Sequence, residues 1–148
     1  MVERVAEPFD LVIIDSPPGT GPEPRAVLMA ADVAIVPVGP GGTDAWALAE
    51  TLDLIEAAQN TRGDGELAAR LVLTKIDTRT RMGRTARQDF EADEGVTIPF
   101  LRTTIGLRTA YAEALTAGTG PTTWEPKGRA AEEVRALARE LSRLRRTS

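Results

Sequence analysis

The chain has 148 residues, 42% of them apolar, which predicts a single globular domain, residues 1–148, with one hydrophobic core. It contains neither cysteine nor histidine, which excludes disulfides, thiolate metal sites, a cysteine nucleophile and a histidine general base. The net charge of −4 conceals an asymmetry, because residues 1–60 are acidic whereas residues 61–148 carry 14 arginines.

Short apolar runs alternate with longer helical patterns along the chain. This alternation is typical of an α/β fold in which helices flank a mostly parallel sheet. In chain order, the predicted strands are Phe9–Asp15, Val33–Val38, Arg70–Leu73 and Ile98–Leu101. The predicted helices are Arg25–Ala31, Ala45–Gln59, Arg81–Ala92, Leu107–Ala117 and Arg129–Arg146. Gly118 is expected to end the fourth helix in a left-handed conformation, and a loop is expected to follow it.

The first predicted strand ends at Asp15 and continues directly into the turn sequence SPPGTG. Ligands bind to open parallel sheets at this end of the strands. A carboxylate placed there can hold a hydrated Mg²⁺ beside a polyphosphate, because this cation prefers oxygen ligands. Gly19 could bring its N–H close to a terminal phosphate, since it has no Cβ. The alternative interpretation is a strand end and turn with only a structural role.

Five segments, taken in order, resemble the ParA/MinD-type deviant Walker ATPases. DLVIIDSPPG resembles their Walker B and switch II segment, and VAIVPVGPGGTDAWAL resembles their next strand and loop. LVLTKIDTRTRMG, LRTTIGLRTAYAEAL and WEPKGRAAEEV resemble the strand ends and helix that follow. These segments cover nearly the whole chain, so the ordered set is far more specific than any one of them.

The resemblance implies a P-loop NTPase-like fold that uses ATP and Mg²⁺. It places Asp15 on the metal side, Gly19 beside phosphate, and Thr74 with Asp77 near the base. TKID, residues 74–77, also resembles the guanine-reading tetrapeptide of GTP-binding proteins, which leaves the preference for ATP or GTP open. A solvated Lys75 followed by a turn at Asp77 is an equally simple interpretation.

The resemblance has one departure. The glycine-rich Walker A loop with its lysines should precede Asp15, yet only 14 residues do so, and GPGGTD at 39–44 lacks a Gly-Lys-Ser/Thr sequence. We therefore expect a fold incomplete at its N-terminus: a fragment, a truncated product or half of a split protein. No residue is assigned as catalytic, and we expect no ATP hydrolysis by this chain alone. The missing Walker A strand should leave strands 9–15 and 33–38 facing a gap or paired to each other.

Arginines carry a second prediction. By resemblance, Arg79 and Arg108 correspond to positions through which partition ATPases bind DNA without reading its sequence. Arg81, Arg84 and Arg87 are expected to extend that surface along a helix. A solvated helix face is the alternative. The resemblance further implies plasmid or chromosome partition, a centromere-binding adaptor, a homodimer, and a cytoplasmic, nucleoid-associated location. No membrane partner is expected, because the C-terminal helix has no apolar face beyond its core stripe.

Two other classes of protein remain as alternatives. One is a pseudo-ATPase interaction module that binds DNA or an adaptor without nucleotide turnover. The other is a phospho-acceptor receiver domain, for which the required acidic pair, Glu3 and Glu7, is poorly placed.

Overall fold

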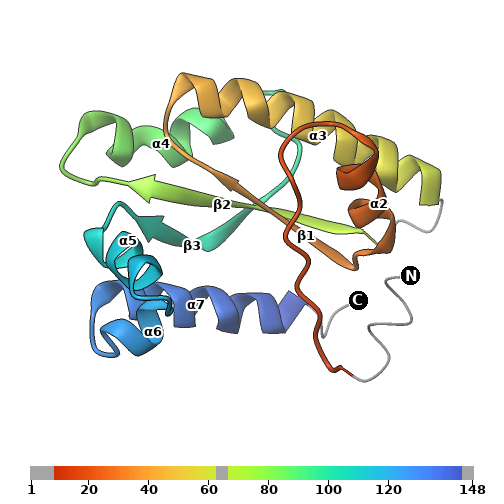
Figure 1. Cartoon of the computed structure of the whole chain (residues 1–148). Coiled ribbons are helices and arrows are strands. Elements are labelled where there is room, and N and C mark those ends of the chain that lie inside the picture. Colours follow the sequence, from red (N-terminus) through yellow and green to blue (C-terminus); the bar gives the residue numbers. More distant parts are fainter. Residues whose placement is uncertain (1–8, 63–66, 145–148) are drawn as a thin grey trace.

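The computed structural model describes residues 9–62 and 67–144. Its sheet consists of β1 (Val33–Val38), β2 (Ala68–Ile76) and β3 (Phe100–Gly106), which are parallel and lie in that order. Figure 1 shows helices on both faces of this sheet. The predicted α/β class is therefore confirmed, and the layout is consistent with a P-loop NTPase-like fold.

The helices form two layers. On one face lie α2 (Pro22–Ala30), α3 (Gly42–Arg62) and α4 (Arg81–Glu91). On the other lie α5 (Thr109–Thr116), α6 (Pro121–Trp124) and α7 (Arg129–Leu144). Gly118 has a φ of 66°, which confirms its left-handed conformation after α5. The short α6 lies within the predicted loop, and the end predicted for the last helix, Arg146, lies outside the described residues.

The core lies between the sheet and the layer that contains α3 and α4. Leu71 and Leu73 of β2 pack there against Leu48 and Leu52 of α3 and Phe90 of α4. The β1 strand pairs in register with β2 from Val33 opposite Ala68 to Val38 opposite Leu73. Apolar side chains on neighbouring strands thus form the continuous buried surface predicted for a parallel sheet.

The β3 strand is the edge of the sheet that faces α7. It begins two residues later than predicted and extends through the polar sequence Arg102-Thr103-Thr104 to Gly106. Glu140 of α7 explains this extension, since its carboxylate accepts hydrogen bonds from the backbone N–H of Arg102 (2.7 Å) and of Thr103 (2.9 Å). The carboxylate of a helix residue here accepts the backbone hydrogen bonds that a further strand of the sheet would otherwise accept.

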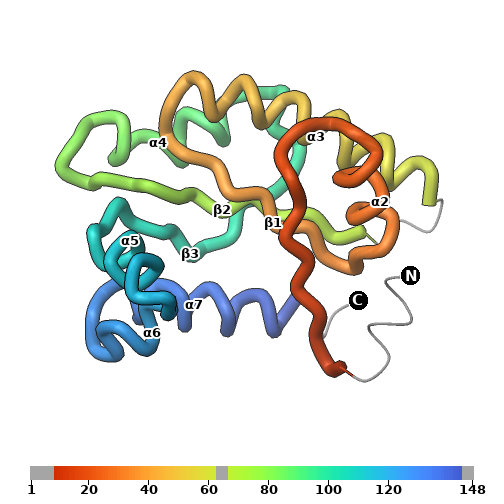
Figure 2. The backbone as a smooth tube through the Cα atoms, in the orientation of Figure 1, coloured from red at the N-terminus to blue at the C-terminus, as the bar shows by residue number. Residues whose placement is uncertain are grey.

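The prediction of a strand over Phe9–Asp15 is wrong. This segment is extended but belongs to no sheet, and the side chain of Ile13 is 86% exposed. Its path can be followed as the red part of the tube in Figure 2. An apolar run forms a strand only where a neighbour satisfies its backbone, and β1 pairs with β2 alone among the described residues. Segments 9–15 and 33–38 are not paired to each other.

Candidate functional site

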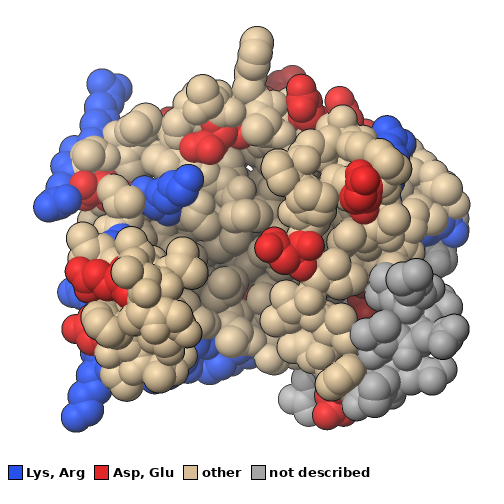
Figure 3. Space-filling model, viewed as in Figure 1, with Lys and Arg blue, Asp and Glu red and all other residues tan. Residues whose placement is uncertain are grey.

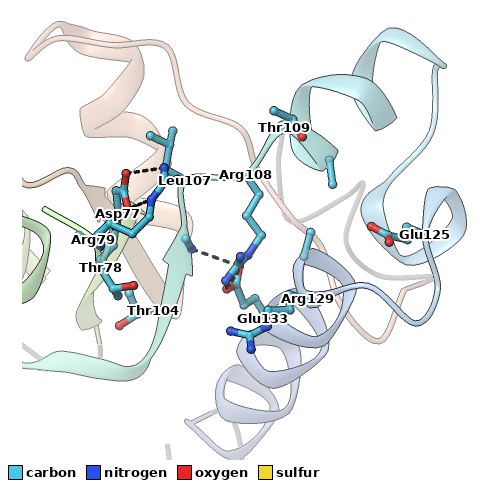
Figure 4. Close-up of a pocket in the computed structure, with 14 residues that line it drawn as sticks. Asp77, Thr78, Arg79, Thr104, Leu107, Arg108, Thr109, Glu125, Arg129 and Glu133 are labelled. Carbon is cyan, nitrogen blue, oxygen red and sulfur yellow. Dashed lines mark hydrogen bonds and ion pairs between the residues drawn. The ribbon is translucent and has the colours of Figure 1, made fainter.

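A hollow of about 740 Å³ opens at the carboxyl ends of β2 and β3. Its walls come from the turn after β2, the junction of β3 with α5, and the first turn of α7, as Figure 4 shows. Open parallel sheets bind ligands at this end of the strands. The hollow is therefore the candidate site. Its acidic side chains come from more than one element of the fold, and so do its basic side chains.

The end of β2 and the turn after it have a locally determined conformation, in which the hydroxyl and the backbone N–H of Thr80 both bond to the carbonyl oxygen of Asp77. Lys75 has a φ of 56°, unusual for a residue other than glycine, and the pairing of β2 with β3 shifts register between Leu73 and Ile76. Thr80 then caps α4: its hydroxyl donates to the carbonyl oxygen of Asp77 at 2.9 Å and accepts from the N–H of Gly83 at 3.0 Å. These bonds fix Asp77 at the wall of the hollow.

Asp77 and Arg79 form a two-pronged ion pair. The guanidinium donates from Nε to Oδ1 at 2.9 Å and from Nη2 to Oδ2 at 2.8 Å. The backbone N–H of Arg79 adds a third bond to Oδ1 at 3.0 Å. The side-chain hydrogen bonds from Arg79, followed by the backbone bond, lower the pKa of Asp77 to about 2. Asp77 is thus ionised at every physiological pH, and its carboxylate is already engaged.

Glu133 of α7 joins three elements at the opposite wall of the hollow. Its Oε1 accepts from Arg108 Nη2 at 2.5 Å and Nε at 2.9 Å, while its Oε2 accepts from the Gly106 N–H at 3.1 Å and the Tyr111 hydroxyl at 3.0 Å. Burial alone would raise the pKa of Glu133, but these donors outweigh burial and lower it. Burial, and then the bond to Glu133, raise the pKa of Tyr111.

The residues predicted from the sequence fall into two groups. Asp77, Arg79 and Arg108 all line the hollow, although Arg108 is bound to Glu133 rather than displayed on the surface. Arg81 and Arg84 lie nearby on the first turn of α4, and both are exposed.

The other predicted residues lie outside the hollow. Asp15 and Gly19 are exposed and belong to the segment before α2, whereas Thr74 is half-buried in β2; none of the three lines the hollow. Gly19 has a φ of 104°, a conformation that favours glycine for backbone reasons alone. Within the described ranges 9–62 and 67–144, no group of three or more acidic side chains is arranged so that it could hold a metal ion, so Asp15 belongs to no such group there. Glu3 and Glu7 lie outside those ranges.

Sequence reasoning missed Glu133, Tyr111 and Glu140. Glu133 and Glu140 are seven residues apart, which places two carboxylates on one face of α7, and this spacing was the available signal. This spacing does not indicate which distant residues the two carboxylates bond to.

Basic side chains project from the edge of the molecule where β2 and β3 end, with acidic side chains between them, as Figure 3 shows from one side. Within the described residues, no helix is both long and apolar enough to cross a membrane.

The sheet, its two helical layers and a hollow at the strand ends define a layered α/β protein with a P-loop NTPase-like layout. No protein-family model matches the chain. The chain is 30% identical over 141 residues to the maintenance of carboxysome distribution protein A of Halothiobacillus neapolitanus, which covers 93% of this chain and 63% of that protein. It is 26% identical over 141 residues to the sporulation initiation inhibitor protein Soj of Bacillus subtilis, covering 95% of this chain and 55% of Soj.

Both relatives are ParA/MinD-type ATPases and match most of this chain, which confirms the predicted resemblance to that family. The chain spans less than two thirds of the length of either relative. Members of the family use nucleotide and Mg²⁺ and act in positioning or partition.

Proposed function

We propose that this chain acts as part of a ParA-like positioning protein in plasmid or chromosome segregation and binds DNA without reading its sequence. One observation carries the DNA-binding proposal: Arg79, Arg81 and Arg84 lie on one turn and the helix that follows it, and all three are exposed. Guanidinium groups bind phosphate through paired N–H donors, and contacts of this kind suit non-specific binding to bulk DNA.

For nucleotide binding we propose only a base side and a metal and phosphate side, which lie apart in this chain. The hollow beside Asp77 is the candidate base side of an ATP or GTP site, with Thr74 behind it in β2. Asp15 and Gly19 are the candidates for the metal and phosphate side, but they do not line that hollow. The described residues therefore do not form a complete site for magnesium and nucleotide. The phosphate-binding loop would have to come from outside these 148 residues.

The partners follow from the same proposal. A centromere-binding adaptor, a second copy of this chain and the nucleoid in the cytoplasm are the expected surroundings of a ParA-like protein. Because the names of the two relatives refer to carboxysome distribution and to sporulation, the cargo is to be identified by experiment rather than from the fold.

A second candidate is an interaction module that binds DNA or an adaptor without turning over nucleotide. The exposed position of Asp15, away from the hollow, favours this candidate. Binding of DNA by the chain without nucleotide would support it, whereas binding that requires nucleotide and an added glycine-rich lysine loop would support the ATPase.

DNA binding is tested by titrating the chain into a fluorescent 30-base-pair duplex of random sequence at several salt concentrations. We expect affinity to fall steeply with salt, and we expect Arg81→Ala to make the log–log slope shallower by about 0.9, as loss of one phosphate contact should. Arg139→Ala is the matched control, because Arg139 is also exposed but lies on α7, on the other face of the sheet. A slope equally changed by both variants, or no binding at all, would overturn the proposed surface.

A further inference from the structure

The guanidinium of Arg79 uses one edge to hold Asp77. That edge consists of Nε and Nη2, and each donates to a different oxygen of the Asp77 carboxylate. The Arg79 side chain is nevertheless 87% exposed. The arginine therefore stands in solvent with its Nε–Nη2 edge already occupied.

A DNA phosphate can bind a guanidinium at the Nε–Nη2 edge or at the Nη1–Nη2 edge, so the Asp77 carboxylate occupies one of the two edges of Arg79 and offsets its positive charge. Arginine binds phosphate most strongly when two parallel N–H groups meet two oxygens, the geometry in which Asp77 now holds Arg79. We propose that Asp77 competes with DNA phosphate for Arg79 and so lowers the affinity of the chain for DNA. This inference rests on the DNA-binding surface proposed above and describes how that surface is regulated.

The neighbouring arginines are not restrained in this way. Arg84 donates only from Nη1, to the carbonyl oxygens of Thr78 at 3.3 Å and Arg79 at 2.8 Å, which leaves its Nε–Nη2 edge open to phosphate. Arg81 forms no ion pair with any residue in the described ranges. Asp77 thus controls how strongly one of the three arginines, Arg79, binds DNA phosphate. The other two arginines provide the affinity for DNA that does not depend on Asp77.

Removing the charge of Asp77 should leave the turn folded. Thr80 bonds to the backbone carbonyl of Asp77 rather than to its carboxylate. Asparagine retains an Oδ1 that can accept the bond from the Arg79 N–H. Asp77→Asn therefore removes the ion pair with the Arg79 guanidinium but keeps the Thr80 cap of α4.

The test compares four proteins for binding to the 30-base-pair duplex: wild type, Asp77→Asn, Arg79→Ala and the double variant. Asp77→Asn should bind about two- to five-fold more tightly at low salt, the range set by the strength of exposed ion pairs. The slope of log affinity against log salt concentration should become steeper by about 0.9 in Asp77→Asn, since one phosphate contact is gained. Arg79→Ala should abolish this gain in the double variant.

Asp89→Asn is the matched control for net charge. Asp89 lies exposed on α4, accepts a hydrogen bond from the Thr85 hydroxyl and forms no ion pair with an arginine among the described residues. A gain in Asp77→Asn that exceeds the gain in Asp89→Asn and disappears with Arg79→Ala supports the competition. If wild type binds DNA but Asp77→Asn behaves like Asp89→Asn, the competition is wrong and the surface stands. If none of the proteins binds, the surface itself is wrong and the inference fails with it.

Discussion

Replacing Gly83 by alanine is expected to lower the free energy of unfolding by about 1 to 3 kcal/mol, the range for overpacking a tight site. A Cβ at this position would lie 2.1 Å from the carbonyl oxygen of Asp77 and 2.7 Å from its carbonyl carbon. Both atoms are backbone, so either α4 or the turn after β2 must move. Urea denaturation followed by circular dichroism measures the loss.

The control for this substitution is Gly42→Ala, at the first residue of α3. A Cβ on Gly42 would meet no atom within 4 Å. Alanine is also the better helix former, by about 1 kcal/mol in a helix interior, so Gly42→Ala should be neutral or stabilising. If Gly83→Ala proved as stable as wild type, the close approach of α4 to the Asp77 backbone would be wrong.

Glu133→Ala is the second large effect, with an expected loss of about 2 kcal/mol from donors left without an acceptor. The carboxylate accepts from the Gly106 N–H, the Arg108 guanidinium and the Tyr111 hydroxyl, and its side chain is only 18% exposed. The substitution therefore loosens the junction of β3, α5 and α7 at once. The midpoint of urea denaturation reports this loss.

Two further observations separate this effect from a general loss of charge. Glu132→Ala removes the adjacent, exposed carboxylate and should cost about 0.3 to 1 kcal/mol, mainly through the helix dipole, because Glu132 attracts Arg108 less than Glu133 does. Tyr111 is the only tyrosine, so its ultraviolet absorbance can be titrated without overlap from another phenol. Its pKa is raised first by burial and then by Glu133, and it should fall in Glu133→Ala but not in Glu132→Ala. Equal stability losses in the two variants would contradict the role given to Glu133.

Local hydrophobic patterns predicted those strands and helices whose formation depends mainly on their own sequence. Val33–Val38 is a strand with the predicted bounds, because it is a short, continuous apolar run beside a second such run. Phe9–Asp15 also contains a short apolar run, Leu11–Ile14, but it has no neighbouring strand among the described residues, and a local sequence pattern does not show whether a neighbour exists. The end of β3 was missed because the bonds that satisfy Arg102 and Thr103 come from Glu140, 37 or 38 residues away.

The candidate site was predicted in outline but not in its contacts. The family resemblance directed attention to Asp77, Arg79 and Arg108, and the fold brings all three to one hollow. It could not indicate that Asp77 holds Arg79 or that Glu133 holds Arg108, because ion pairs depend on rotamers and on a helix later in the chain. Those two pairs engage two of the arginines that the resemblance assigned to DNA binding.

Turnover of nucleotide tests the central claim most directly, namely that this chain resembles ParA/MinD-type ATPases but does not bind and hydrolyse a triphosphate by itself. Release of phosphate from ATP by the purified 148-residue chain should not exceed the rate without protein, with or without magnesium. A clear magnesium-dependent rate that Asp15→Ala abolishes would contradict the account, because it would place a working phosphate site beside a carboxylate found exposed and away from the hollow.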